Sequence, residues 1–167
     1  MLLIGELLAQ AGMIEGKYVS WLPSYGPEMR GGTANCSVVV SDKPIASPVI
    51  TQAGCVVAMN RPSLDKFEKT LRAGGLLIVN SSLISVKASR SDVDVCYITA
   101  NDTAEELCNT QAANMVILGA YLEKKPIVKV ESVLEALRLR LGERRAHLVE
   151  INQRALAAGA EAVRQGA

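Results

Sequence analysis

The chain has 167 residues, of which 49% are hydrophobic and 21% are charged, a balance typical of one globular domain and too apolar for a disordered chain. Its 18 basic and 17 acidic residues leave a formal net charge of +1, which argues against a general nucleic-acid binder because such proteins need a basic excess to displace counterions. The longest strongly apolar stretch, residues 115–122, is far shorter than the about 20 residues of a membrane span.

The N-terminal quarter of the chain is predicted to form one helix and two strands. Apolar residues recur at helical spacing over residues 4–11, and Gly12 and Gly16 are expected to end that helix. Residues 18–22 and 33–41 have the composition of short strands, and the segment between them is a loop dense in glycine and proline.

The middle of the chain alternates between strand and helix patterns. Wholly apolar strands are predicted at residues 55–59 and 76–79, and a further strand at 93–99. A helix after Pro62, with Leu71 on its apolar face, is expected between the first two and is expected to end at Gly74-Gly75. Such alternation indicates an α/β fold with a sheet whose strands are joined by crossover helices.

The C-terminal part is predicted to be helical. Asp102, with Glu105 as its capping-box partner, is expected to cap a short helix, and Asn109 is expected to cap the next. Amphipathic patterns over residues 132–141 and from 143 to about 164 predict two more helices.

The cysteines and the single histidine offer no complete reactive centre. Cys36, Cys55, Cys96 and Cys108 lack the short spacing of zinc or iron–sulfur ligands. We interpret them as reduced, mostly buried thiols of a cytoplasmic protein. His147 lies in a basic segment and is expected at the surface, which disfavours a Ser-His-Asp triad or a multi-histidine metal site.

The loop over residues 23–32 has an unusual composition for a connection between strands. It offers Glu28, Arg30 and the pair Gly31-Gly32. Successive glycines let backbone N–H groups converge on an anion, and an arginine presents a planar fork to phosphate or carboxylate. By composition alone, a hairpin loop with solvated charges and a ligand or partner surface both remain open.

The same loop carries a resemblance that extends over almost the whole chain. Residues 21–36, Trp-Leu-Pro-Ser-Tyr-Gly-Pro-Glu-Met-Arg-Gly-Gly-Thr-Ala-Asn-Cys, resemble the signature of the gamma subunit of 2-oxoacid:ferredoxin oxidoreductases. Supporting blocks follow in order at residues 41–45, 58–60, 74–75, 80–82, 109 and 113–115. The resemblance implies a single gamma-type domain over residues 1–167 with the architecture of that family, which is an α/β fold of three layers, α/β/α, around a central sheet that is mostly parallel, with a mixed sheet left open.

The resemblance implies that this chain is one subunit of a larger enzyme. The family converts a 2-oxoacid, coenzyme A and oxidised ferredoxin to acyl-CoA, carbon dioxide and reduced ferredoxin. Thiamine diphosphate, magnesium and iron–sulfur clusters are expected in partner alpha, beta and ferredoxin-like delta subunits, with no cofactor or catalytic residue on this chain. The signature is more similar to the 2-oxoglutarate or branched-chain type than to the pyruvate type, and 2-oxoglutarate is the expected substrate.

Two other functions remain open at this point. One is a stand-alone α/β module that binds a nucleotide or acyl-CoA without redox partners. The other, within the broader family, is an indolepyruvate oxidoreductase. In every case we expect a cytoplasmic protein with neither nucleic acid nor a membrane as its partner.

The matching positions give the expected site residues. Those of the signature loop would face coenzyme A or the partner subunits: Ser24, Tyr25, Gly26, Glu28, Arg30, Gly31, Gly32, Thr33 and Asn35. Of these, Arg30 would pair with a phosphate of coenzyme A or with a partner carboxylate. Asn60, Asn80, Ser81 and Asn109 are possible strand-end ligand contacts, and a purely capping role is an equally open interpretation of them.

The chain departs from the family pattern in two places. Members usually begin with a strand and a Gly-x-Gly-Gly-Gln-Gly turn, whereas this sequence starts directly in the following helix. A start assigned too late, a truncation and a true absence all remain open, and without that strand we expect a sheet edge or groove that needs cover. Cys108 stands where the family commonly has glycine, which costs about 1–2 kcal/mol if the position requires a positive φ.

Overall fold

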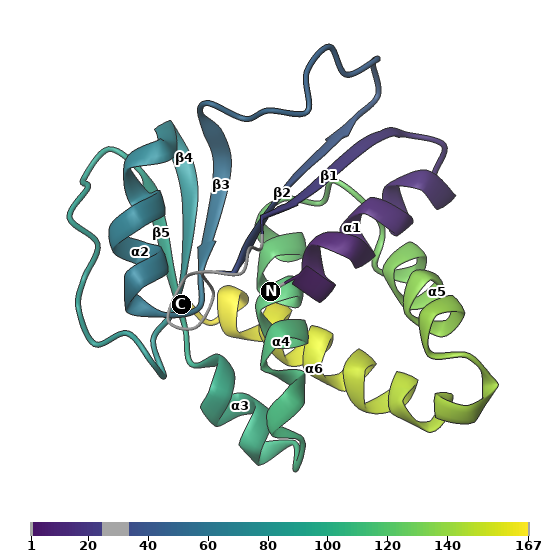
Figure 1. Cartoon of the computed structure of the whole chain (residues 1–167). Helices are drawn as coiled ribbons and strands as arrows, with labels where there is room; N and C mark the ends of the chain where they lie inside the picture. Colours follow the sequence, from purple (N-terminus) through teal and green to yellow (C-terminus); the bar gives the residue numbers. More distant parts are fainter. Residues whose placement is uncertain (1, 25–33, 167) are drawn as a thin grey trace.

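The fold begins with a helix that packs on a two-stranded hairpin. Helix α1 (Leu2–Ile14) contacts both β1 (Tyr18–Ser24) and β2 (Asn35–Ser41), which pair antiparallel. The architecture is that of a computed structural model, in which residues 2–24 and 34–166 are described (Figure 1). Three consecutive valines end β2 before Ser41, and the two that point to the same side, Val38 and Val40, pack against the core on the side of α1.

A parallel sheet forms the centre of the molecule. Its strands are β3 (Ala53–Ala58), β4 (Leu71–Asn80) and β5 (Asp94–Ile98), in the order β3-β4-β5. The second half of β4 is apolar and buried on both faces. Leu76 and Ile78 face one hydrophobic cluster, whereas Leu77 and Val79 face another, because successive side chains of a strand point to opposite sides.

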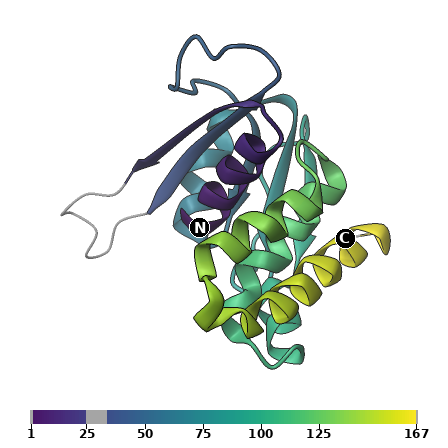
Figure 2. The same cartoon turned by 90° about the vertical axis from the view of Figure 1, so that its right-hand side faces the viewer.

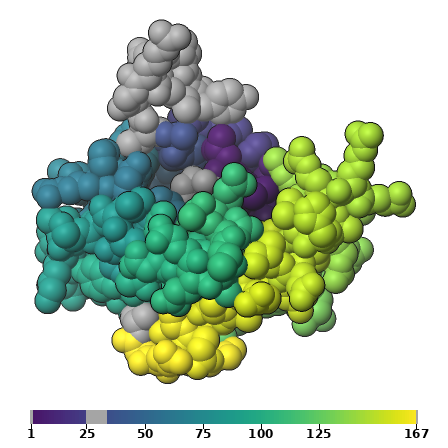
Figure 3. All heavy atoms as spheres, turned by 90° about the horizontal axis from the view of Figure 1, so that it is seen from below, coloured from purple at the N-terminus to yellow at the C-terminus, as the bar shows by residue number. Residues whose placement is uncertain are grey.

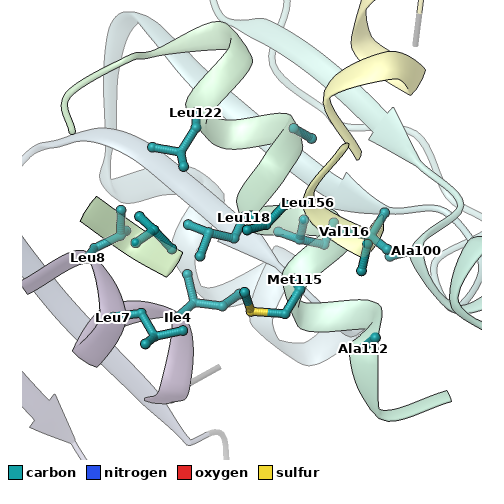
Figure 4. Packing of buried hydrophobic residues seen from close by; sticks show 14 of the residues in the cluster. Ile4, Leu7, Leu8, Ala100, Ala112, Met115, Val116, Leu118, Leu122 and Leu156 are labelled. Atoms are coloured by element: carbon teal, nitrogen blue, oxygen red, sulfur yellow. The ribbon is translucent and has the colours of Figure 1, made fainter. Parts of the chain in front are cut away.

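Helices cover both faces of this sheet. The short helix α2 (Arg61–Phe67) buries Leu64 in the smaller cluster. On the other face lie α4 (Ala113–Lys124) and α6 (His147–Arg164), as Figures 1 and 2 show. The larger cluster, part of which is drawn in Figure 4, joins α1, α4 and α6 through Leu8, Met115 and Leu156, among others.

The remaining helices complete that second layer. Helix α3 (Ala100–Glu106) precedes α4, and α5 (Val130–Leu141) packs on α1. Short 3-10 turns occupy Glu68–Thr70, Thr110–Ala112 and Glu143–Arg145. In Figure 3, which views the molecule from below, the yellow C-terminal helix runs beside the green segment of α3 and α4. None of the described helices is long and apolar enough to cross a bilayer.

Helices α4 and α6 cross at two glycines. A β-carbon on Gly119 would overlap the carbonyl of Leu156, and one on Gly159 would overlap the carbonyl of Val116. The two backbones are therefore in contact, and α6 is fixed closely on the layer that covers the sheet.

The sequence-based prediction of an α/β fold with helices on both faces is confirmed, but two predicted boundaries are wrong. Helix α2 ends at Phe67, and Leu71 already pairs with Ala53 as the first residue of β4. The glycines at 74 and 75 lie within a bulge of β4, since the next pair is Cys55 with Leu76. Gly12 likewise lies inside α1, where a β-carbon would stand 2.8 Å from Val19.

The predicted cap of the short third helix is also wrong. Asp102 lies inside α3, and Thr99 occupies the cap position without a side-chain hydrogen bond. The hydroxyl of Ser82, which follows β4, instead accepts hydrogen bonds from the backbone N–H groups of Asn101 (3.1 Å) and Asp102 (3.3 Å). The start of α3 is therefore capped by Ser82, which is distant in the chain, and not by the local side chain of Asp102.

Candidate functional site

The signature segment, residues 25–34, lies in the chain between β1 and β2, and these two flanking strands pair as a hairpin. Ser24 and Asn35 are the last register pair. Figure 2 shows the hairpin extending away from the helices to this end. The residues on either side of the segment are therefore neighbours across the hairpin. Its other predicted site residues lie outside the described residues: Tyr25, Gly26, Glu28, Arg30, Gly31, Gly32 and Thr33.

Apolar side chains beside this end of the hairpin remain accessible. Trp21 is 37% exposed and Leu22 is 46% exposed, although both belong to a paired strand. Next to them, burial raises the pKa of the Cys36 thiol, and a hydrogen bond from Trp21 opposes that shift only partly. The hairpin thus presents an apolar, uncharged surface next to the ends of the signature segment.

A large cavity lies between β2 and β3. Its volume is about 790 Å³, and its walls include residues of both strands together with α1, α2 and α4. Burial raises the pKa of Cys55 in this cavity to about 12, against the opposing charge of Lys125. Burial also raises the pKa of the Tyr121 hydroxyl. Both groups therefore stay protonated at neutral pH, and the cavity is predominantly apolar.

Two of the four predicted strand-end residues cap helical turns. The side chain of Asn60 accepts a hydrogen bond from the backbone N–H of Ser63 at 3.0 Å, at the start of α2. The side chain of Asn109 accepts one from the backbone N–H of Gln111 at 3.1 Å. These contacts match the capping interpretation that the sequence left open.

Asn80 is the most deeply buried of the predicted site residues. Its amide donates to Oδ1 of Asn101 at 2.8 Å and to the carbonyl of Met59 at 3.5 Å. It is fully buried, and its own Oδ1 has no hydrogen-bond partner among the described residues. The backbone N–H of Ser81 donates to the carbonyl of Ile98 at 2.9 Å. This cluster ties the carboxyl ends of β3, β4 and β5 together.

The structure does not bring all the predicted site residues together. Asn35 lines the cavity between β2 and β3, whereas Ser81 lines a separate pocket of about 270 Å³ beside Tyr97. Sequence reasoning missed Ser82 and Asn101, which organise the strand ends. A serine close behind a buried strand was the available signal, since Ser82 lies two residues after the end of β4. The backbone N–H groups that donate to it belong to Asn101 and Asp102, which come only after the next strand, β5.

The cysteines are less buried than predicted. Cys96 is buried and Cys108 is exposed, whereas Cys36 and Cys55 are half-buried. In the ranges 2–24 and 34–166, no three histidine, cysteine or acidic residues come together as a set of metal ligands. The site is therefore a surface and a cavity, without a donor set for a metal among the described side chains.

Comparison with known proteins gives a matching family and several similar proteins. The family described as Pyruvate ferredoxin/flavodoxin oxidoreductase matches residues 1–162. The Ketoisovalerate oxidoreductase subunit VorA of Methanothermobacter thermautotrophicus is 36% identical over 166 residues, which cover 99% of this chain and 34% of that protein. The chain thus spans about a third of the length of that relative.

A shorter relative and a solved structure agree with this match. The 2-oxoglutarate synthase subunit KorC of Methanothermobacter marburgensis is 34% identical over 145 residues, 83% of this chain and 78% of that protein. The keto/oxoacid ferredoxin oxidoreductase gamma subunit from Geobacter sulfurreducens has 29% identity and a TM-score of 0.84, over 99% of this chain and 92% of that one.

Proposed function

Because this chain belongs to the pyruvate ferredoxin/flavodoxin oxidoreductase family, we propose that it is the gamma component of a CoA-acylating 2-oxoacid:ferredoxin oxidoreductase. The reaction is the oxidative decarboxylation of a 2-oxoacid to its acyl-CoA, with ferredoxin as electron acceptor. The observation that carries this role is the hairpin register, in which Ser24 and Asn35 hold the signature segment at one end of a strand pair packed on α1.

The cofactors of the reaction belong, in this proposal, to other polypeptides of the complex. The described cysteines lie on separate elements and do not form a cluster site. We assign thiamine diphosphate, magnesium and the iron–sulfur clusters to alpha, beta and ferredoxin-like delta subunits, which supply the carbanion chemistry and the electron path. We place the assembled enzyme in the cytoplasm, with ferredoxin as its redox partner.

In this proposal, the chain contributes part of the surface that lines the coenzyme A binding region of the enzyme. The exposed Trp21 and Leu22 give the hairpin an apolar face for a neighbouring subunit. Arg30, in the segment between the strands, is assigned to a phosphate of coenzyme A or to a partner carboxylate. A hydrogen bond of a guanidinium to such an anion contributes about 1.5–3 kcal/mol.

For the oxoacid itself we propose 2-oxoglutarate. The relatives carry names that specify both ketoisovalerate and 2-oxoglutarate as substrates of their enzymes. The form of the signature over residues 29–36 favours the 2-oxoglutarate or branched-chain type over the pyruvate type.

The test is reconstitution of the complex. The chain is co-purified with the thiamine-binding subunits, and CoA-dependent ferredoxin reduction is measured with 2-oxoglutarate, ketoisovalerate and pyruvate. We expect activity only in the assembled complex, with the highest kcat/KM for 2-oxoglutarate. The R30A variant is expected to raise the KM for coenzyme A or to weaken assembly, with Lys43→Ala, an exposed site at the other end of the hairpin, as the control.

Three outcomes would contradict the proposal. Failure to assemble, together with tight binding of acyl-CoA by the isolated chain, would favour the stand-alone binding module. A preference for another oxoacid would remove the substrate assignment alone. Unchanged kinetics and unchanged assembly in R30A would remove the role of that arginine.

A further inference from the structure

The two faces of the β1–β2 hairpin differ in what covers them. Val19 and Val40 face α1, since both stand within 3.2 Å of the β-carbon that Gly12 would carry. Because successive side chains of a strand point to opposite sides, Tyr18 and Leu22 lie on the other face. Among the described helices, α1 is the one that packs closely on both strands, and Figure 1 shows it on one side of the hairpin. The face that bears Tyr18 and Leu22, which we call the outer face, has no such cover among the described helices.

On the outer face, each large side chain stands opposite a serine. The register pairs Tyr18 with Ser41, Ser20 with Val39 and Leu22 with Ser37. Tyr18 is 50% exposed and Leu22 is 46% exposed. The large residues thus alternate between the two strands, and the serines leave hollows between them. An opposing layer can insert its own side chains into such hollows, as packed layers of a protein do.

Neither strand of the hairpin carries a charged residue. The sequence of β1 is Tyr-Val-Ser-Trp-Leu-Pro-Ser and that of β2 is Asn-Cys-Ser-Val-Val-Val-Ser, in a chain of which 21% is charged. The solvated face of an antiparallel sheet is normally polar, whereas the centre of a protein interface is depleted of charge and enriched in aromatic residues. The outer face therefore has the composition of a surface that becomes covered, and it fits an apolar, uncharged partner surface.

The dimensions of the outer face fit one α-helix. Each strand has seven residues, which span about 24 Å, and paired strands lie about 4.8 Å apart. A single helix, about 10 Å across, covers such a narrow ribbon with about 16 residues, whereas a second sheet would extend beyond it on both sides. A second copy of this chain does not offer that helix in α5 or α6, because their exposed faces carry charged residues such as Glu135 and Arg154.

We propose that the outer face binds one amphipathic α-helix of a thiamine-binding subunit, which lays its apolar stripe along the two strands. The hairpin is then enclosed between α1 and this helix, as a sheet is between two layers. The outer face continues to Ser24 and Asn35, which flank the signature segment, so the same subunit can contact both surfaces. This inference rests on the proposed function, which supplies the partner subunit.

The experiment uses the complex reconstituted with the thiamine-binding subunits. Tyr18 and Leu22 are replaced, one at a time, by the photo-crosslinking residue p-benzoylphenylalanine. Leu139 on α5, which is 72% exposed, is the control position. Mass spectrometry after irradiation identifies the crosslinked residues. We expect both hairpin positions to crosslink to one helix of a thiamine-binding subunit, at residues about three or four apart on its apolar face, and position 139 to crosslink to neither subunit.

A charge on the outer face gives a second measurement. Leu22→Arg should weaken binding to the thiamine-binding subunits by about tenfold or more, because the charge would be buried against an apolar partner. Leu139→Arg is the matched control and should leave binding unchanged. The thermal unfolding midpoint of each variant chain alone should stay at that of the natural chain, since both side chains are exposed.

The outcomes separate this inference from the proposed function. An assembled, active complex without crosslinks from positions 18 and 22 would overturn the inference and leave the function intact. Crosslinks to a strand, or to a second copy of this chain, would do the same, as would unchanged binding of L22R. Failure of the complex to assemble at all would overturn both.

Discussion

Gly5 of α1 and Cys36 of β2 approach so closely that a β-carbon on Gly5 would stand 2.5 Å from the Cys36 sulfur. The indole nitrogen of Trp21 would stand 3.1 Å from the same β-carbon. The absence of a side chain at Gly5 thus lets α1 lie directly on the hairpin. The helix and both strands form one unit, which determines where the signature segment begins and ends.

The first prediction concerns this contact. Gly5→Ala would stabilise a free helix by about 0.8–1 kcal/mol, but here we expect a loss of about 1–3 kcal/mol because the added methyl group has no space. In the double variant with Cys36→Ala, the cost of Gly5→Ala should fall by at least about 0.5 kcal/mol. Urea unfolding of both single variants and the double variant measures this coupling. A neutral or stabilising Gly5→Ala would contradict the described approach.

The second prediction concerns the buried carboxylate of Glu68. It accepts hydrogen bonds from the backbone N–H of Ser89 (2.7 Å), the hydroxyl of Ser89 (2.9 Å) and the backbone N–H of Arg90 (3.0 Å). Glu68→Gln removes the charge that these donors share, and we expect a loss of about 1.5–3 kcal/mol. Amides near Ser89 should exchange faster. The exposed Glu105→Gln is the control, and an equal effect of both substitutions would contradict this role.

The third prediction concerns strain at Cys108. Its φ is 56°, the only positive value among the described residues other than glycine. Cys108→Gly relieves a cost of about 1–2 kcal/mol and adds chain entropy to the unfolded state, so we expect a net gain of about 0.5–1 kcal/mol. Cys108→Ala is the matched control, since alanine keeps the β-carbon. Thermal unfolding of both variants tests this, and a gain in the alanine variant would point to another cause.

The fourth prediction concerns pH. Burial raises the pKa of Cys55 to about 12, whereas an unfolded thiol titrates near about 8.5. Above that value the unfolded state loses a proton that the folded state keeps. The stabilising contribution is therefore complete below about pH 8.5 and declines as the pH rises toward the folded pKa.

The free energy of unfolding, measured from about pH 8 to about pH 11, should thus fall more steeply for the natural chain than for Cys55→Ala. Tyr121, whose pKa is raised by burial as well, contributes in both proteins. The difference between the two curves reports the thiol together with its effect on the pKa of Tyr121, which the charge of Cys55 raises further. Parallel curves would show that Cys55 is not held protonated by the fold.

Local patterns were sufficient for most elements but not for the change of structure near Leu71. The spacing of Leu64, Phe67 and Leu71 fits one helix face, yet Leu71 pairs with Ala53 in the sheet. The helical spacing of apolar residues therefore extends to Leu71, although pairing with β3 places Leu71 in a strand. The same applies to Asp102, whose local capping pattern gives way to the hydroxyl of Ser82.

The candidate site was predictable only in part for a related reason. The composition of residues 23–32 identified an unusual loop, and the hairpin register gives it two fixed ends at Ser24 and Asn35. Asn60 and Asn109 have the same residue type as Asn80, but they cap helical turns while Asn80 holds the strand ends. Residue type and spacing alone do not distinguish these uses of an asparagine side chain.

The amino-acid sequence by itself determined the α/β class, the buried strands and the limits of several helices, because periodicity and turn residues act over a few neighbouring positions. Only the tertiary structure decided which polar groups are used in caps, how closely Gly5 lies to Cys36, and that the strands separate between β2 and β3. These features depend on residues that are distant in the chain, and their cost or gain arises only when the layers pack together.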